Sequence, residues 1–144
     1  MQHDCKYKFV ALMDTFSILR THNLRRTACR EGILKVIMTS GKALSESEIR
    51  SNLSGNFDRT TFYRSFKTME DSGILHKIVV DDRMIRYGLS ESVTGKSSHP
   101  HFYCTSCHSV FCLEDSLVAP QLPAGYSSQN LEMIVKGVCK KCNA

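Results

Sequence analysis

Residues 58–75 have the sequence DRTTFYRSFKTMEDSGIL, which predicts an amphipathic helix that leads into a β-strand. Asp58 is a favourable N-cap, and Gly73 is the type of residue that follows a helix end, so the helix is expected to run to about Ser72. Three large apolar side chains recur at i, i+4 and i+7 and form its buried stripe: Phe62, Phe66 and Met69. The side chains on the other face therefore point toward solvent or a partner.

The outward face of this helix is basic and rich in hydrogen-bonding groups. An α-helix fits the major groove of DNA, where arginine bonds guanine bidentately and threonine or aromatic groups meet the thymine methyl group. The predicted DNA-contacting residues on this helix are Arg59, Thr60, Tyr63, Arg64 and Lys67. Arg25, beside Arg26, is a further candidate for a phosphate or a neighbouring minor groove. The alternative for all of these side chains is an ordinary solvated surface.

The flanking sequence predicts a winged helix-turn-helix domain over residues 1–90. Apolar spacing favours a helix over residues 4–20 and a second one from Thr27 to Ser40. The segment from Ser45 to Glu48 matches a capping box and begins a third helix, which Gly55 is expected to end. Residues 74–80 and 84–89 are β-rich and enclose a short polar turn, as in a hairpin. Helices followed by a hairpin are the element order of a winged helix.

Two Cys-x-x-Cys pairs, Cys104 with Cys107 and Cys139 with Cys142, predict one structural zinc ion. Zinc binds thiolates at about 2.3 Å, and four sulfurs close the tetrahedron, which leaves no position for a substrate. Two disulfides or buried free thiols are the alternatives. The odd total of seven cysteines and the lack of a secretory signal favour zinc, because they suit a reducing compartment. We therefore expect a cytoplasmic protein.

The remaining sequence predicts a small α/β domain over residues 99–144, which follows an interdomain linker at residues 91–98. The linker segment lacks periodicity and is rich in small polar residues. The elements expected after it are strands at residues 101–104, 110–113 and 129–135 and a short helix at residues 114–119. The predicted fold class is therefore α+β, with a winged-helix domain and a second domain that contains a four-cysteine zinc site.

The composition restricts the possible functions. The 144-residue chain has a formal charge of +5, and residues 1–73 hold 12 Lys and Arg against 8 Asp and Glu. A basic first half is the part expected to bind a polyanion. No apolar run approaches the roughly 20 residues of a membrane span. The absence of a Gly-rich phosphate loop and of a His-Glu-x-x-His helix argues against an enzyme with a small-molecule substrate.

Four ordered motifs resemble the ferric uptake regulator family. Residues 58–75 resemble its A-T-V-Y-R-x-L-x-x-L-x-x-x-G-I-[VL] recognition helix, and Thr27-x-x-Arg30 resembles its T-x-x-R helix opening. Residues 99–107 resemble its H-x-H-x-x-C-x-x-C stretch, and the second cysteine pair follows in order. The likeness covers about residues 24–142 and implies a repressor that binds double-stranded DNA as a homodimer through a C-terminal dimerisation domain. It also implies that Tyr63 and Arg64 face DNA and that Arg25 approaches the minor groove.

The chain departs from this family at the positions of the regulatory metal ligands. Those positions hold other residues here: Ala43, Gly88, Pro100, Cys112, Ala119 and Leu131. His99 and His101 remain as candidate ligands of a second divalent metal, which Glu91, His108 or Glu114 could help to bind. The alternative for both histidines is a structural or surface role. We expect regulation by a second metal to be weak, absent, or dependent on ligands unlike those of the family.

The role of Cys112 and two rival functions remain open. Cys112 is either a thiol sensor or a small buried hydrophobic residue. The first rival function is a zinc-ribbon adaptor whose winged helix binds another protein, and salt-dependent binding to duplex DNA would distinguish it from a regulator. The second is a metalloenzyme, which requires an open metal position beyond the four cysteines.

Overall fold

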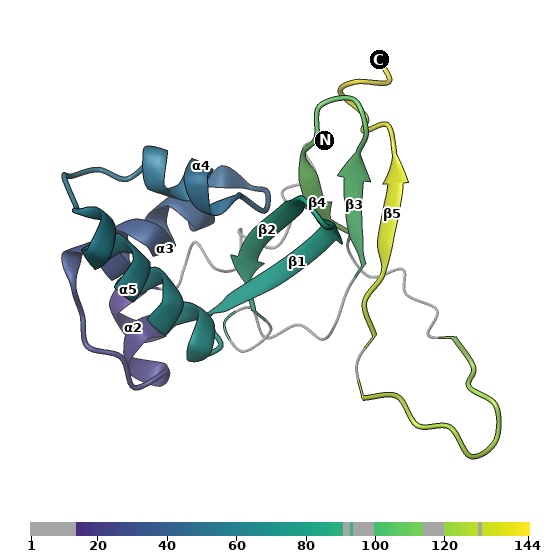
Figure 1. Ribbon diagram of the computed structural model, residues 1–144, viewed down its shortest axis with the longest axis horizontal. Helices are drawn as coiled ribbons and strands as arrows, with labels where there is room; N and C mark the ends of the chain where they lie inside the picture. Colours follow the sequence, from purple (N-terminus) through teal and green to yellow (C-terminus); the bar gives the residue numbers. More distant parts are fainter. Residues whose placement is uncertain (1–13, 91–92, 94–99, 114–119, 130) are drawn as a thin grey trace.

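The computed structural model describes residues 14–90, 93, 100–113, 120–129 and 131–144 (Figure 1). The helices are α2 Thr15–Thr21, α3 Ala28–Ser40, α4 Glu46–Ser51 and α5 Arg59–Asp71. The strands are β1 Leu75–Asp81, β2 Met84–Leu89, β3 His101–Cys104, β4 Val110–Cys112 and β5 Ile134–Gly137. Figure 1 shows the helices together on one side, the β1–β2 hairpin in the middle, and β3, β4 and β5 on the other side. The α+β prediction is confirmed.

Local sequence signals explain where α3 and α4 begin and end. The Thr27 hydroxyl accepts a hydrogen bond from the backbone N–H of Arg30, and Gly41 follows α3 with φ of 67°, a left-handed conformation that glycine adopts easily. The predicted capping box of α4 is present, because Glu48 N donates to Ser45 Oγ at 3.1 Å and Ser45 N donates to Glu48 Oε2 at 2.7 Å.

Two helix boundaries differ from the prediction. Gly55 does not end α4, because the side-chain and backbone amides of Asn52 both bond Glu48 O and stop the helix at Ser51. The helix predicted over residues 4–20 is described only as α2, which extends to Thr21, and residues 1–13 lie outside the described residues.

The predicted stripe of α5 lies in the core of the N-terminal half. Phe62, Phe66 and Met69 are at most 3% exposed, and Phe66 meets Tyr87 of β2 edge-on with ring centres 4.7 Å apart. The same core contains buried residues of α2, α3 and both hairpin strands: Ile18, Leu19, Ile33, Leu34, Ile37, Leu75 and Leu89. Because this stripe is buried in the core, the opposite face of α5 is exposed to solvent.

The hairpin follows α5 after Gly73, whose φ is 80°. Strands β1 and β2 pair antiparallel with Leu75 opposite Leu89 and His76 opposite Gly88, and a register shift occurs between Val79 and Asp81. This is the wing that the two β-rich runs predicted.

The C-terminal sheet has the strand order β4-β3-β5, in which β3 is antiparallel to β4 and parallel to β5. Its last strand begins at Ile134 and not at residue 129 as predicted. Residues 120–129 are exposed and contain Pro120, Pro123 and a left-handed Gly125, which are unsuited to strand pairing. Pairing starts where His101 N donates to Met133 O. The short helix expected at residues 114–119 lies outside the described residues.

The two halves are joined by a small apolar cluster between the hairpin and the C-terminal sheet. Its buried members are Ala43, Ile78, Val80, Tyr103 and Val110. Ala43 N also donates to Val110 O at 3.1 Å. Within the predicted linker, Val93 is buried in the core of the N-terminal half, and its neighbours lie outside the described residues. No helix in the described part of the chain is long and apolar enough to cross a membrane.

We predict that Ser45→Ala will lower the free energy of unfolding by about 0.5–2 kcal/mol, because the capping bond to the Glu48 N–H is lost. The measurement is urea unfolding followed by circular dichroism. Ser47→Ala on the same helix is the matched control, since Ser47 is exposed and lies outside the capping box. Equal unfolding midpoints for the two variants would contradict the assigned role.

Candidate metal site and nucleic-acid surface

The four cysteines of the two pairs come together at one end of the C-terminal sheet. Strands β3 and β5 are parallel, so Cys104 at the end of β3 and the residues that follow β5 meet at the same edge. The sulfur atoms of Cys104, Cys107, Cys139 and Cys142 all lie within 4.8 Å of one another. Cys107 Sγ and Cys139 Sγ are 3.8 Å apart, which matches the edge of about 3.8 Å of a tetrahedron with zinc–sulfur distances of about 2.3 Å.

The electrostatics of this cluster favour a bound cation. The backbone N–H groups of Cys107 and Cys139 point at Cys104 Sγ, at 3.5 and 3.3 Å, and lower the pKa of Cys104 to about 6. In contrast, the neighbouring sulfurs of Cys139 and Cys107 raise the pKa of Cys142 to about 12. Several thiolates in so small a space repel one another, and a divalent cation removes that repulsion. The donor set and the geometry therefore fit a structural zinc ion.

Among the described residues, these four cysteines are the one group of three or more His, Cys, Asp or Glu side chains with metal-ligand spacing. His108 does not join them, because its Nδ1 lies 2.6 Å from the Tyr103 hydroxyl. His101 is buried on β3, and its ring stacks on His76 of β1 with centroids 5.9 Å apart. His99, Glu91 and Glu114 lie outside the described residues.

The other family ligand positions in the described part of the chain are apolar or packed, and Ala119 lies outside it. Ala43 is 3% exposed and bonds Val110 in the junction between the two halves. Gly88 is buried in β2, and Leu131 lines a pocket beside the C-terminal sheet. Cys112 ends β4 and is half-buried, which agrees better with a packed side chain than with an exposed thiol.

The outward face of α5 presents most of the predicted DNA-contacting residues together. Asp58 Oδ1 accepts from Thr61 N at 2.6 Å and caps the helix. Arg59, Thr60, Tyr63 and Arg64 are exposed in the first two turns. The Arg59 guanidinium lies 5.4 Å from the centre of the Tyr63 ring. This cation–π contact places positive charge beside an aromatic ring on the helix surface.

Lys67 is also exposed, but it has an intramolecular partner. Its Nζ lies 3.0 Å from Asp71 Oδ1, and this hydrogen bond raises the pKa of Lys67. Both side chains are more than 60% exposed, so solvent screens the pair and its contribution to stability is small.

The two arginines before α3 differ in their contacts. Arg26 Nε lies 2.9 Å from Glu31 Oε1, and the hydrogen bond lowers the pKa of Glu31. Arg25 is exposed, and its carbonyl oxygen accepts from Arg30 Nη1 at 2.6 Å, which fixes the backbone that carries it. Arg25 is therefore the better placed of the pair for contact with a partner.

The sequence did not indicate a second group of arginines beside Tyr63. A hollow of about 670 Å³ is lined by Arg50 of α4, Tyr63 of α5, Arg83 at the hairpin turn and Arg86 of β2. Arg50 and Arg83 are exposed, whereas Arg86 is half-buried. The one sequence signal was the position of Arg83 in a polar turn. The convergence of three elements on Tyr63 arises only from the tertiary packing.

The comparisons with known proteins agree with this architecture. The model of the ferric uptake regulator family matches residues 21–143. The peroxide-responsive repressor PerR of Staphylococcus saprophyticus is 25% identical over an alignment of 139 positions that covers 91% of this chain and 90% of that protein.

Two solved structures show the same fold at low identity. The ferric uptake regulator of Vibrio cholerae superposes with a TM-score of 0.65 at 21% identity, covering 88% of this chain and 100% of that one. The regulator Fur of Helicobacter pylori gives a TM-score of 0.58 at 19% identity, covering 92% and 96%, and its structure is described as having three functional metal binding sites.

Proposed function

The chain belongs to the ferric uptake regulator family, and we propose that it is a transcriptional repressor that binds a palindromic operator as a homodimer in the cytoplasm. The observation that carries this proposal is the exposed face of α5, where Arg59, Thr60, Tyr63 and Arg64 stand together immediately before the wing. A capped helix with an apolar inner stripe and a basic outer face is the form of a major-groove reader.

The proposed DNA contacts fall into two classes. Thr60, Tyr63 and Arg64 read base edges, because they lie on the exposed helix face where a major groove would meet it. The longer or more peripheral cations bind phosphates and set the register on the duplex: Arg25, Arg50, Arg59, Lys67 and Arg83. Phosphate contacts supply affinity that falls with salt, whereas base contacts supply sequence preference.

The proposed homodimer is supported by the outer edge of the C-terminal sheet. Strand β5 lies at one side of the strand order and pairs with β3 on its inner side. Val135 on this strand is 41% exposed, and Val138 just after it is 45% exposed. We propose that a second copy of the chain covers this edge, since a two-fold dimer reads half-sites about one helical turn apart.

The zinc ion is proposed to hold this domain in shape and to leave the chemistry of regulation to other groups. One ion per chain is bound by four thiolates, which fill its coordination positions: Cys104, Cys107, Cys139 and Cys142. A closed site suits a regulator and gives no position for a substrate. It ties the β3–β4 turn to the segment after β5, which is the edge proposed for dimerisation.

The test is a DNA-binding assay on protein with measured metal content. Duplexes selected from a random pool by the zinc-loaded protein are expected to contain an inverted repeat and to bind with a steep salt dependence. Light scattering is expected to give two chains per duplex. Failure of the folded, zinc-loaded protein to retain any duplex at low salt would contradict the proposal and favour the protein-binding adaptor.

A further inference from the structure

Three arginines from separate elements line one hollow beside Tyr63, here called the arginine hollow. Its volume is about 670 Å³, and its cationic residues are Arg50 of α4, Arg83 at the hairpin turn and Arg86 of β2. Among the described residues, Glu46 is the one acidic residue in its lining. Three guanidinium groups against one carboxylate leave an excess of positive charge, so the hollow favours an anion.

The charge of Arg86 is only partly compensated by the protein. Its side chain is 17% exposed, and its Nε lies 4.0 Å from Glu48 Oε2, which is too far for a hydrogen bond. That carboxylate oxygen already accepts from Ser45 N in the capping box. Within the described part of the chain, Arg86 makes one hydrogen bond, from Nη1 to Ile85 O at 3.1 Å, and a guanidinium has further N–H donors to offer. A partly buried cation of this kind gains from an anion brought into the hollow.

Hydroxyl groups stand beside the arginines. Ser47, Arg50 and Ser51 are spaced i, i+3 and i+4, so they share one face of α4, and all three are exposed and line the hollow. Tyr63 of α5 lines it as well, and its phenol is 39% exposed. A phosphate group presents three strong acceptor oxygens, which suit guanidinium and hydroxyl donors that converge from several elements.

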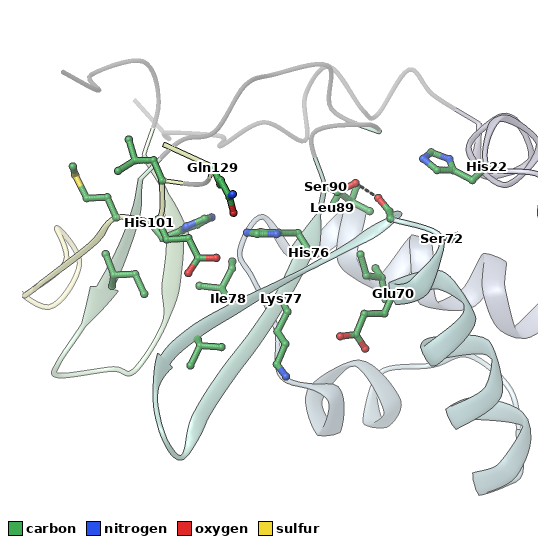
Figure 2. A pocket seen from close by; sticks show the side chains of 17 residues that line it. His22, Glu70, Ser72, His76, Lys77, Ile78, Leu89, Ser90, His101 and Gln129 are labelled. Carbon is green, nitrogen blue, oxygen red and sulfur yellow. Dashed lines mark hydrogen bonds between the residues drawn. The ribbon is translucent and has the colours of Figure 1, made fainter. Parts of the chain in front are cut away.

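A larger cavity elsewhere in the molecule lacks this charge pattern. Figure 2 shows this cavity, which has a volume of about 830 Å³. Among the described residues that line it, Lys77 is the only lysine or arginine, and it is outnumbered by the carboxylates of Glu70 and Glu132. The excess of guanidinium groups is therefore a property of the arginine hollow and does not follow from cavity size.

We propose that the arginine hollow binds the phosphate groups of a free small molecule, and that this ligand competes with duplex DNA. The volume of the hollow lies in the range of small-molecule sites, about 300–1,000 Å³. Arg50, Tyr63 and Arg83 are also the proposed duplex contacts, so a ligand that occupies them lowers operator affinity. This competition rests on the proposed DNA-binding function, whereas the binding of the ligand itself does not.

The experiment measures ligand binding without DNA, with sodium pyrophosphate as the probe. Zinc-loaded protein is titrated by calorimetry in about 100 mM chloride, where exposed charges more than about 10 Å apart are largely screened. The wild-type protein is expected to bind pyrophosphate at one saturable site per chain. Arg50→Ala and Arg83→Ala are each expected to weaken this binding about tenfold, because a charge-assisted hydrogen bond is lost.

Arg20→Ala is the matched control, since Arg20 is an exposed arginine on α2 that does not line the hollow. Arg50 and Arg83 are exposed too, so the unfolding midpoints of all three variants should equal that of the wild type. A wild-type protein without saturable pyrophosphate binding would overturn the proposal. Equal pyrophosphate affinities of the Arg50→Ala, Arg83→Ala and Arg20→Ala proteins would also overturn it.

Duplex binding by the same proteins separates the ligand site from the proposed function. Pyrophosphate added at constant ionic strength is expected to release duplex from the wild-type protein. If pyrophosphate is not bound but Arg50→Ala and Arg83→Ala weaken duplex binding, the hollow holds only a backbone phosphate of DNA. That result overturns the free ligand and leaves the proposed function intact. If pyrophosphate binds as expected and no duplex is retained, the proposed function fails and the ligand site stands.

Discussion

Removal of the structural zinc is expected to unfold the C-terminal sheet and to dissociate the proposed dimer. Strand β5 has four residues and β4 has three, so the hydrogen bonds of this sheet are few, and the ion adds the main cross-link between its ends. Structural zinc sites contribute roughly 10–16 kcal/mol of apparent binding free energy, which is part of the folding free energy when the site exists only in the folded state. The loss is therefore far larger than the contribution of any one side chain in this domain.

The measurement pairs a strong chelator with a cysteine substitution. Cys139→Ser is expected to lose zinc, to lose β-sheet signal in circular dichroism, and to become monomeric in light scattering. Cys112→Ser is the matched control, because Cys112 lies on the same sheet but outside the four-cysteine cluster. A metal-free protein that keeps its sheet and its dimer, or a protein prepared under reducing conditions that contains two disulfides, would show that the cysteines have another role.

Arg64→Ala is expected to weaken specific operator binding by about 1–3 kcal/mol, or roughly 5- to 150-fold, and to relax the preference at one base position. The reason is that Arg64 is exposed on α5, opposite the buried stripe, so its removal affects the DNA contact and leaves the core intact. Lys67→Ala is expected to lower the affinity for all duplex sequences to a similar extent. It should also reduce the salt dependence of binding, because a lysine binds phosphate as a point charge.

Competition assays with the operator and with scrambled duplexes distinguish these two effects. Lys35→Ala is the matched control, since Lys35 is an exposed cation on α3 that is not among the predicted contacts. Unfolding midpoints of all variants should agree. If the Arg64→Ala protein binds the operator as tightly as the wild type, the assignment of α5 as the reading helix is wrong.

Much of the N-terminal half could be predicted from its sequence, because its signals are local. The cap at Asp58, the stripe of Phe62, Phe66 and Met69, and the capping box at Ser45 each depend on residues within one or two helical turns. The turn between the hairpin strands is equally local. The boundaries that failed, at Gly55 and at the start of β5, depended on the Asn52 amides and on where the chain reaches the edge of β3.

The sequence by itself determined which chemical groups are available. The spacing of the two cysteine pairs indicates zinc because each pair is a local knuckle that holds two thiolates, and the order of the helices and hairpin indicates a winged helix. The sequence also shows that Lys and Arg outnumber Asp and Glu in the first half of the chain.

Only the tertiary structure decided which distant groups meet. Arg50, Tyr63 and Arg83 line one hollow although they come from α4, α5 and the hairpin turn, and no local pattern encodes that arrangement. The sequence did not single out His76, because an isolated histidine in a strand belongs to no recognisable motif. It meets His101 because Ile78, Val80, Tyr103 and Val110 pack the hairpin against the C-terminal sheet. Contacts of this kind depend on the register of two separate sheets and on the apolar surface buried between them, which are properties of the folded chain as a whole.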